Sequence, residues 1–329
     1  MKLVISVSGI GNTLMATPLI KELAKNKSVV CVLVGNKPSA EILKQNFDVK
    51  ETFVMDRGYT FSNIRLLFQL RKIGFDESYM IFPANRWFFN LISFIVGAKK
   101  RFAHNYPNKR FTSLFFLNNK RVDMKEVHDV EQNLSLLKNY KLNNKKDINL
   151  VLKIKQIKPK KIKGLVGIHP GSSTDSDMEM KRWPEKYYAQ LINKLKIPVR
   201  VFIGPDEERS YEELKSHLKR PVEEIRENSI IKVAEKISQC EKFVANDSGL
   251  MHIASTLGIP VVAIFGPTEP RRNAPYKGKS KVLFHKMHCQ PCSHNFKNLG
   301  TKTKCIYSKR YCLTRLGPDT VLKAIEELK

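Results

Sequence analysis

The stretch from Val244 to Pro270 constrains the fold more than any other part of the chain, because it predicts a strand, a helix and a second strand in immediate succession. An apolar run ends at Ala245, apolar residues then recur at helical spacing between Leu250 and Leu257, and a second apolar run covers Val261–Phe265. Such a unit places two parallel strands in one sheet and packs the helix on a face of that sheet.

Polar residues follow both strands of this unit. Asn246–Gly249 has the composition of a turn and a helix N-cap, and Gly266–Thr268 follows the second strand. The helix start offers unpaired N–H groups and a positive dipole end to an anion such as a diphosphate. Singly, Asp247 and Ser248 are explained as caps and His252 as a packed core residue. Together, at the carboxyl ends of parallel strands, they predict a ligand site.

Both halves of the chain repeat the alternation of strand, polar turn and helix. In the first half the strand at Leu3–Val7 runs into the turn Ser8–Thr13, and in the second half the strand at Gly164–Ile168 runs into His169–Ser173. Lys153–Lys163 is a basic stretch with a proline, which we interpret as a linker, although such a run also suits phosphate binding. The pattern predicts the α/β class, with two parallel sheets covered by helices.

The chain of 329 residues carries a net charge of +27, with Lys and Arg spread along its whole length. This field favours an anionic partner, which leaves nucleic acid, an anionic membrane surface or a phosphorylated glycolipid; solvated lysine-rich faces are the alternative. No segment is apolar for long enough to span a membrane, and the run Leu3–Val7 is too short for a signal peptide. We therefore expect a cytoplasmic protein. The most apolar predicted helix, Trp87–Val96, is interpreted as buried beside the sheet rather than as a membrane contact.

Four blocks of sequence resemble glycosyltransferase family 9, the ADP-heptose:lipopolysaccharide heptosyltransferases. They are Gly9–Pro18, His169–Ser173 with Lys181–Pro184, Asn246–Thr268, and the C-terminal cysteines. The resemblance implies a GT-B fold, in which two Rossmann-like parallel-sheet domains face a central cleft. Residues 1–155 would form the acceptor-side domain and residues 156–329 the nucleotide-sugar-binding domain. A final helix, residues 318–328, would pack back toward the N-terminal domain.

The resemblance also implies roles in an inverting transfer, in which negative charge develops on the departing diphosphate. Lys181 would pair with the diphosphate, Asp247 and His252 would hold the sugar or its phosphate, and Glu208 would reach the ribose. No metal or other cofactor would be required for catalysis. The remaining residues predicted to bind substrate are His169, Ser172, Ser173, Ser248, Gly249, Gly266 and Thr268 on the donor side, and Gly11 and Thr13 on the acceptor side.

Asn12 departs from the family pattern, which usually has Asp at this position as the proposed general base. An amide cannot accept a proton near neutral pH. One account is that Asn12 positions the acceptor while Asp175, Asp177 or Glu179 takes the proton. A second is late proton loss to water, and the third is loss of activity. We favour the first two, because the donor-site residues are all present.

Four of the six cysteines lie within residues 288–313, and two of them form a C-x-x-C pair. Four thiolates in one loop suit a tetrahedral site for zinc or iron, which we expect to be structural, with His288 and His294 as spare ligands. Four reduced thiols in a surface loop are the alternative. The predicted metal ligands are Cys289, Cys292, Cys305 and Cys312.

The sequence thus predicts an enzyme that moves a sugar from a nucleoside diphosphate donor, heptose from ADP-heptose, onto the lipopolysaccharide or lipooligosaccharide core. Its acceptor would be an anionic glycolipid, reached by peripheral contact at the cytoplasmic face of the bacterial inner membrane. The alternatives are a protein O-heptosyltransferase and a catalytically silent sugar-nucleotide-binding protein. Nucleic acid is not an expected partner, because the sequence has no recognition helix, RNA-binding aromatic motif or zinc-finger spacing.

Overall fold

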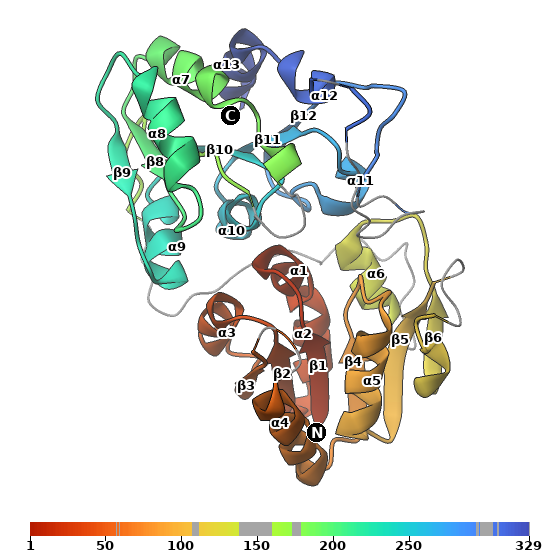
Figure 1. Ribbon diagram of the computed structural model, residues 1–329. Helices are drawn as coiled ribbons and strands as arrows, with labels where there is room; N and C mark the ends of the chain where they lie inside the picture. Colours follow the sequence, from red (N-terminus) through yellow and green to blue (C-terminus); the bar gives the residue numbers. More distant parts are fainter. Residues whose placement is uncertain are drawn as a thin grey trace. The chain divides into compact units, whose positions relative to one another are not determined.

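The computed structural model describes residues 1–56, 58, 60–106, 112–137, 160–172, 179–293, 296, 305–307 and 309–328. The chain divides into two compact units, Met1–Lys155 and Gln156–Lys329. Each unit holds one six-stranded parallel sheet with helices beside it (Figure 1), so the predicted α/β class with two parallel sheets is confirmed. None of the described helices combines the length and the apolar character that crossing a bilayer requires.

The sheet of the first unit has the strand order β3-β2-β1-β4-β5-β6. The adjacent interior strands β1 and β2 are almost entirely apolar and buried, as expected for a parallel sheet that is covered on both faces. The six strands are β1 (Lys2–Ser6), β2 (Val30–Val34), β3 (Glu51–Val54), β4 (Glu77–Met80), β5 (Lys100–Asn105) and β6 (Lys120–Asp123).

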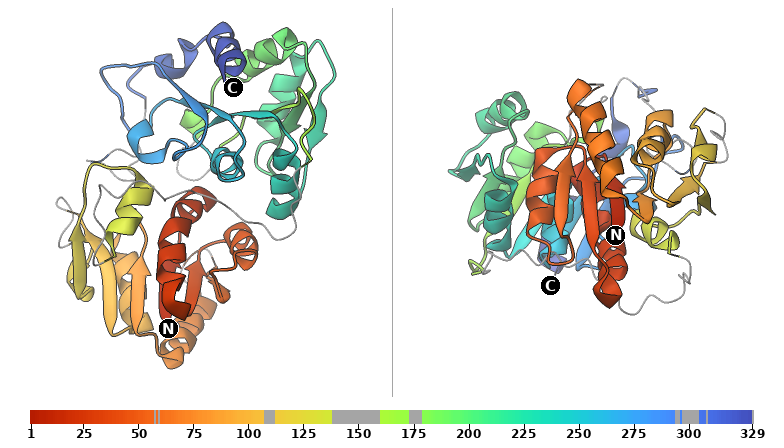
Figure 2. Two further views of the ribbon diagram at one scale, coloured as in Figure 1. Left: turned by 180° about the vertical axis from the view of Figure 1, so that it is seen from behind. Right: turned by 90° about the horizontal axis from the view of Figure 1, so that it is seen from below.

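Helices connect these strands, and the views from behind and from below show them flanking the sheet (Figure 2). Thr60 caps α4 by accepting a hydrogen bond from the Asn63 amide, and Gly74 ends it in a left-handed conformation that suits glycine. The helices are α1 (Ile10–Met15), α2 (Thr17–Ala24), α3 (Lys37–Lys44), α4 (Phe61–Ile73), α5 (Trp87–Val96) and α6 (Asp129–Ser135), with short 3-10 turns at Lys25–Lys27 and Phe115–Leu117.

The helix α5 has the predicted bounds but is only half buried. Ile92 and Val96 are buried in the same hydrophobic core as Leu67 of α4, whereas Trp87 and Phe94 are 44% and 46% exposed. The interpretation of this segment as a buried helix is therefore correct for one face and wrong for the other, because the helix covers the sheet with a single stripe.

The second unit repeats the topology, with the strand order β12-β11-β10-β7-β8-β9. In both sheets the chain starts at a central strand, winds to one edge and then returns to the other side of the start. Ligands bind beyond the carboxyl ends of the strands at this reversal, which lies between β1 and β4 and between β7 and β10. The strands are β7 (Val166–His169), β8 (Val199–Phe202), β9 (Glu223–Ile225), β10 (Lys242–Asn246), β11 (Val261–Phe265) and β12 (Ser280–Phe284).

The last helix, α13, packs inside the second unit. Val321, Ala324 and Ile325 are buried in the same core as Trp183 and Tyr188. Packing of residues 318–328 toward the first domain stays a prediction. The helices of this unit are α7 (Glu185–Lys194), α8 (Glu208–Ser216), α9 (Ile230–Ser238), α10 (Gly249–Thr256), α11 (Pro270–Asn273), α12 (Tyr311–Thr314) and α13 (Pro318–Glu327).

Candidate functional site

The turn between β10 and α10 forms the centre of the candidate site. Ser248 is the N-cap of α10, and its hydroxyl accepts a hydrogen bond from the Met251 amide at 3.4 Å. The first amides of a helix have no carbonyl partner within that helix, and Ser248 caps the third of them, so the amides of Gly249 and Leu250 could bind an anion.

A lysine–aspartate ion pair adjoins this helix start. The ammonium of Lys181 lies 2.9 Å from Oδ2 of Asp247, and both side chains are largely buried. Burial raises the pKa of Asp247, but the charge of Lys181 outweighs it, with help from His252 and the buried Thr268, so that the pKa is held below its ordinary value. Asp247 is therefore ionised at neutral pH, and it holds the Lys181 side chain beside the helix N-terminus.

His252 is buried on the first turn of α10, and its exposed fraction is only 4%. Burial lowers the pKa of His252 to about 4, and the nearby carboxylate of Asp247 only partly opposes this effect. The imidazole is therefore neutral at pH 7. A neutral imidazole offers one N–H donor and one acceptor, which suits hydrogen bonding to a sugar hydroxyl better than charge pairing.

A chain of hydrogen bonds joins Ser248 to an acid that the sequence analysis did not single out. His169 places Nδ1 3.1 Å from the Ser248 hydroxyl and Nε2 3.2 Å from the carboxylate of Glu207. Glu207 also accepts a hydrogen bond from the Gly204 amide at 2.8 Å. Burial raises the pKa of Glu207, but the contacts with His169 and the Gly204 amide, together with the charge of Arg182, outweigh it, and the pKa falls below its usual value.

Glycine is required beside this acid. A Cβ atom built on Gly171 would lie 1.6 Å from Oε1 of Glu207, so any other residue would displace the carboxylate. The predicted ribose ligand, Glu208, has a different environment, because its carboxylate pairs with Arg226 at 3.0 Å on the surface. The sequence places two acids side by side, and only the tertiary structure distinguishes the buried one from the exposed one.

Asn246, the first residue of the turn, has a supporting role that sequence reasoning missed. Its side-chain oxygen accepts hydrogen bonds from the Trp183 amide and the Tyr188 hydroxyl, both at 3.0 Å. Its amide nitrogen donates to the carbonyls of Pro170 and Gly171. This one buried side chain therefore holds the segment that follows Lys181 against the loop that follows β7.

Ser172, which is predicted to bind substrate, forms hydrogen bonds with Arg182. The guanidinium donates to the hydroxyl of Ser172 at 3.3 Å and to its carbonyl at 3.0 Å. Ser173 and the candidate bases Asp175 and Asp177 lie outside the described residues. The third candidate base, Glu179, has an exposed side chain at the edge of this segment.

Two further predicted ligands serve packing in this structure. The predicted turn Ser8–Thr13 is shorter than expected, because the helix α1 begins at Ile10 and contains Gly11 and Asn12, which are partly exposed. The hydroxyl of Thr13 lies 2.7 Å from that of Ser6 inside the first unit, so it ties this helix to the end of β1. A Cβ atom on Gly266 would lie 2.7 Å from Cγ of Leu313, so glycine here permits close packing of α12.

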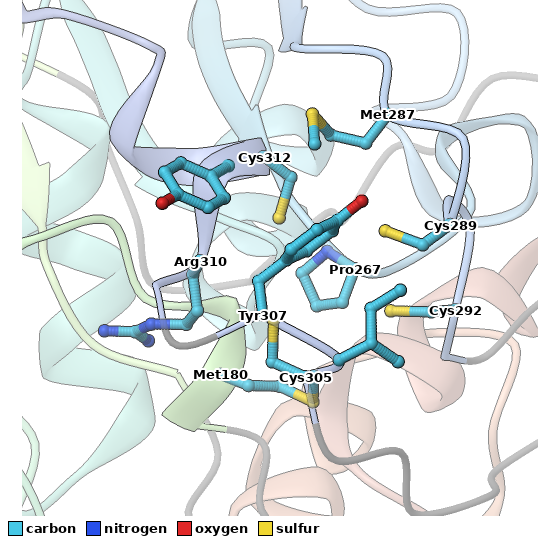
Figure 3. Close-up of a pocket in the computed structure, with 11 residues that line it drawn as sticks. Met180, Pro267, Met287, Cys289, Cys292, Cys305, Tyr307, Arg310 and Cys312 are labelled. Atoms are coloured by element: carbon cyan, nitrogen blue, oxygen red, sulfur yellow. The ribbon is translucent and has the colours of Figure 1, made fainter.

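The four C-terminal cysteines line one pocket, and their sulfur atoms surround Tyr307 in the close-up (Figure 3). Burial raises the pKa of Cys312 to about 11, and the neighbouring thiols add to the effect. Among the described residues, no three His, Cys, Asp or Glu side chains form a group that could hold a metal ion. Of the predicted spare ligands, His288 lies 3.0 Å from the Tyr307 hydroxyl, and His294 is outside the described residues.

The cysteine pocket is connected to the candidate site. Met180 is part of its lining, and Arg310 from the same lining donates a hydrogen bond to the carbonyl of Glu179 at 2.9 Å. Both contacts fall on the residues immediately before Lys181. The loop that bears the cysteines therefore supports the segment that bears the lysine.

The two units with their parallel sheets have the architecture of the GT-B fold. The family model described as glycosyltransferase family 9 (heptosyltransferase) matches residues 65–302. The chain belongs to this family.

Three similar proteins extend over almost the whole chain. Lipooligosaccharide heptosyltransferase 2 of Campylobacter jejuni serotype O:6 is 25% identical over 336 residues, covering 97% of this chain and 96% of that protein. The structure of Escherichia coli heptosyltransferase WaaC with ADP has a TM-score of 0.74 at 17% identity and covers 100% of both chains. The dodecameric iron-containing heptosyltransferase TibC, in complex with ADP-D-beta-D-heptose, has a TM-score of 0.59 at 14% identity and covers 99% of this chain and 76% of TibC.

Proposed function

We propose that this protein transfers heptose from ADP-heptose onto the core of lipopolysaccharide or lipooligosaccharide, with inversion at the anomeric carbon. The observation that carries the proposal is the 2.9 Å pair of Lys181 and Asp247 beside the N-terminus of α10. The names of the relatives support the donor and the acceptor, since one is a lipooligosaccharide heptosyltransferase and another was solved with ADP.

In this proposal the second unit stabilises the leaving group. The bond between the anomeric carbon and the phosphate oxygen breaks while a bond to the acceptor oxygen forms on the opposite face of the sugar. The departing ADP gains negative charge, which the Lys181 ammonium and the first amides of α10 would meet. Asp247 holds Lys181 in place, and neutral His252 would hydrogen-bond the sugar.

The acceptor hydroxyl must lose a proton, and Asn12 cannot take it. We propose that Asn12 orients the acceptor on the first unit, while a carboxylate of the segment that precedes Lys181, or water, receives the proton. Because Asn12 stands where the family usually has aspartate, a catalytically silent sugar-nucleotide-binding protein remains the alternative function. Transfer to a protein hydroxyl remains the alternative acceptor chemistry.

We propose that the acceptor is an anionic glycolipid that the protein reaches from the cytoplasmic face of the inner membrane by peripheral contact. The net charge of +27 supports this assignment, because a basic protein is attracted to phosphorylated glycolipids and to anionic membranes.

Calorimetric titration of the purified protein with ADP, UDP, GDP and CDP tests the donor assignment. The protein should bind ADP in preference to the other three, and Lys181→Ala should weaken ADP binding at least about tenfold, because it removes one charge-assisted contact to phosphate. Lys232→Ala, an exposed lysine on α9, is the matched control and should bind ADP normally. Preference for another nucleotide would contradict ADP-heptose as the donor. Failure to bind any of the four would contradict every function proposed here that needs a nucleoside diphosphate sugar, and would indicate a different class of ligand.

We further propose that Cys289, Cys292, Cys305 and Cys312 bind a structural zinc or iron ion. The donor set supports this, since four thiolates are the ligands of tetrahedral zinc and iron sites, and all four cysteines line one pocket. The ion would stabilise the loop that bears the cysteines, which contacts the segment before Lys181. It would take no part in the bonds made and broken during sugar transfer.

A further inference from the structure

The first unit carries a stripe of exposed apolar side chains on α4. Phe61, Ile64 and Phe68 are 84%, 52% and 54% exposed, and their spacing of three and four residues places them on one face of the helix. The opposite face, with Leu67 and Leu70, is buried against the sheet. A soluble helix normally presents polar residues to solvent, so this outward stripe requires another explanation.

The neighbouring helix presents a second stripe. α4 and α5 pack side by side, and Arg71 of α4 links them by donating a hydrogen bond to the carbonyl of Ile95. Trp87 and Phe94 of α5 are seven residues apart, hence on one face, and both are close to half exposed. The two outward stripes together form what we call the α4–α5 face, which consists of Phe61, Ile64, Phe68, Trp87 and Phe94.

The charged residues of α4 and the residue before α5 are basic, whereas an exposed acid, Asp56, contacts Ser62 on the first turn of α4. Arg65 and Lys72 are exposed on the same side of α4 as Phe68, and Arg86 is exposed immediately before α5. Neither α4 nor α5 contains an acidic residue. Aromatic side chains flanked by arginine and lysine are typical of helices that lie in the interface of an anionic membrane.

We infer that the α4–α5 face docks the protein on an anionic lipid bilayer. A second copy of the chain fits this face less well, because a two-fold dimer through α4 would set Arg65 and Lys72 of one copy against the same cations of the other. The inference rests on the proposed function, since a membrane-bound glycolipid acceptor gives the docking its purpose. It adds the surface by which the protein meets the membrane.

The position of the face suits that purpose. Phe61 and Trp87 begin their helices just beyond the carboxyl ends of β3 and β4. Asn12 lies in α1, which begins beyond the carboxyl end of β1, at the same edge of the same sheet. The end of the α4–α5 face that carries Phe61 and Trp87 therefore lies at the edge of the sheet that carries Asn12.

Tryptophan fluorescence offers a direct test, because the protein has only two tryptophans. Trp87 is in the face, and Trp183 is fully buried in the second unit. Vesicles of phosphatidylglycerol and phosphatidylethanolamine, with no lipopolysaccharide, should shift the emission of the full-length protein to the blue. Vesicles of phosphatidylcholine should not. An unchanged spectrum with the anionic vesicles would overturn the inference.

Sedimentation with the same vesicles separates this face from general attraction to a basic protein. Simultaneous substitution of Phe61, Ile64 and Phe68 by serine should reduce binding more than tenfold, whereas Phe47→Ser, at a 67% exposed residue after α3, should leave binding unchanged. The pair Arg65→Glu and Lys72→Glu should reduce binding by about tenfold or more, and Lys232→Glu should have little effect. Equal loss in the controls would mean attraction by net charge alone and would contradict the inference.

Transfer to a water-soluble, deacylated acceptor distinguishes this inference from the proposed function. The triple serine variant should retain that activity while losing vesicle binding. Vesicle binding by a wild-type protein that transfers no sugar would remove the proposed function and leave the docking face. A dimer in solution that the triple variant abolishes would instead assign the face to a second copy.

Discussion

The Lys181 ammonium lies 2.9 Å from the Asp247 carboxylate, and the two residues come from a loop and from a strand end that are 66 positions apart in the sequence. Removing one partner leaves a buried charge unpaired. We therefore expect Lys181→Ala to lower the free energy of unfolding by about 3 kcal/mol. A double-mutant cycle with Asp247→Asn, followed by urea denaturation, should show that the double variant loses less than the sum of the single variants. Additive losses would mean that the pair does not interact in solution.

Acidification should destabilise the second unit through His252, whose folded-state pKa of about 4 lies below the ordinary value of 6.5. The unfolded chain then binds more protons than the folded one between these values. Stability from this group is complete above pH 6.5 and declines as the pH falls toward 4, by a total of about 3 kcal/mol. Urea denaturation across this range should show the decline in the wild type, and His252→Gln should flatten it. A slope unaltered in the variant would assign the effect to other groups.

The buried acid Glu207 should matter more for donor binding than its exposed neighbour. Glu207→Gln weakens the contact with His169, which in turn contacts the Ser248 cap, so we expect ADP affinity to fall about tenfold. Gly171→Ala should act similarly, because its Cβ displaces the same carboxylate. The matched control is Glu208→Gln, which should bind ADP within about twofold of the wild type. A larger loss in the control would support the ribose contact that the resemblance implies for Glu208.

Asn12 should affect turnover and leave donor binding unchanged. If its amide orients the acceptor, Asn12→Ala should lower kcat about tenfold, which corresponds to the loss of one hydrogen bond. Asn12→Asp restores a proton acceptor, and its rate should rise with pH as the carboxylate ionises. The measurement is release of ADP with extracted acceptor. Undiminished turnover of the alanine variant would remove Asn12 from any catalytic account.

The cysteine pocket should hold about one metal ion per chain in protein purified under reducing conditions. Mass spectrometry of the metals should find zinc or iron, and Cys292→Ser with Cys312→Ser should lose it. The control is Cys31→Ala, a buried cysteine of the first unit. Thermal unfolding adds a second readout, because removal of a structural metal by a chelator should lower the Tm of the wild type only. Protein free of metal and indifferent to chelator would favour four reduced thiols.

The sequence by itself determined the class of fold and most of the central strands. Val30–Val34 and Val261–Phe265 are continuous apolar runs, because a strand in the middle of a parallel sheet is buried on both faces. The edge strands β6, β9 and β12 have no such run, since one side of each lacks a neighbour and the side chains stay partly exposed. Local pattern alone could not reveal them. Motif spacing alone also predicts the turn at Asn246–Gly249.

Only the tertiary structure decided how these residues divide between chemistry and support. Spacing in the sequence could not show that Lys181 meets Asp247, or that Glu207 rather than Glu208 meets His169, because these contacts join separate strands and loops. Nor could it show that Thr13 and Gly266 serve packing. Hydrophobic burial fixes which helix face turns inward, and that choice is what leaves Phe61 and Phe68 pointing outward.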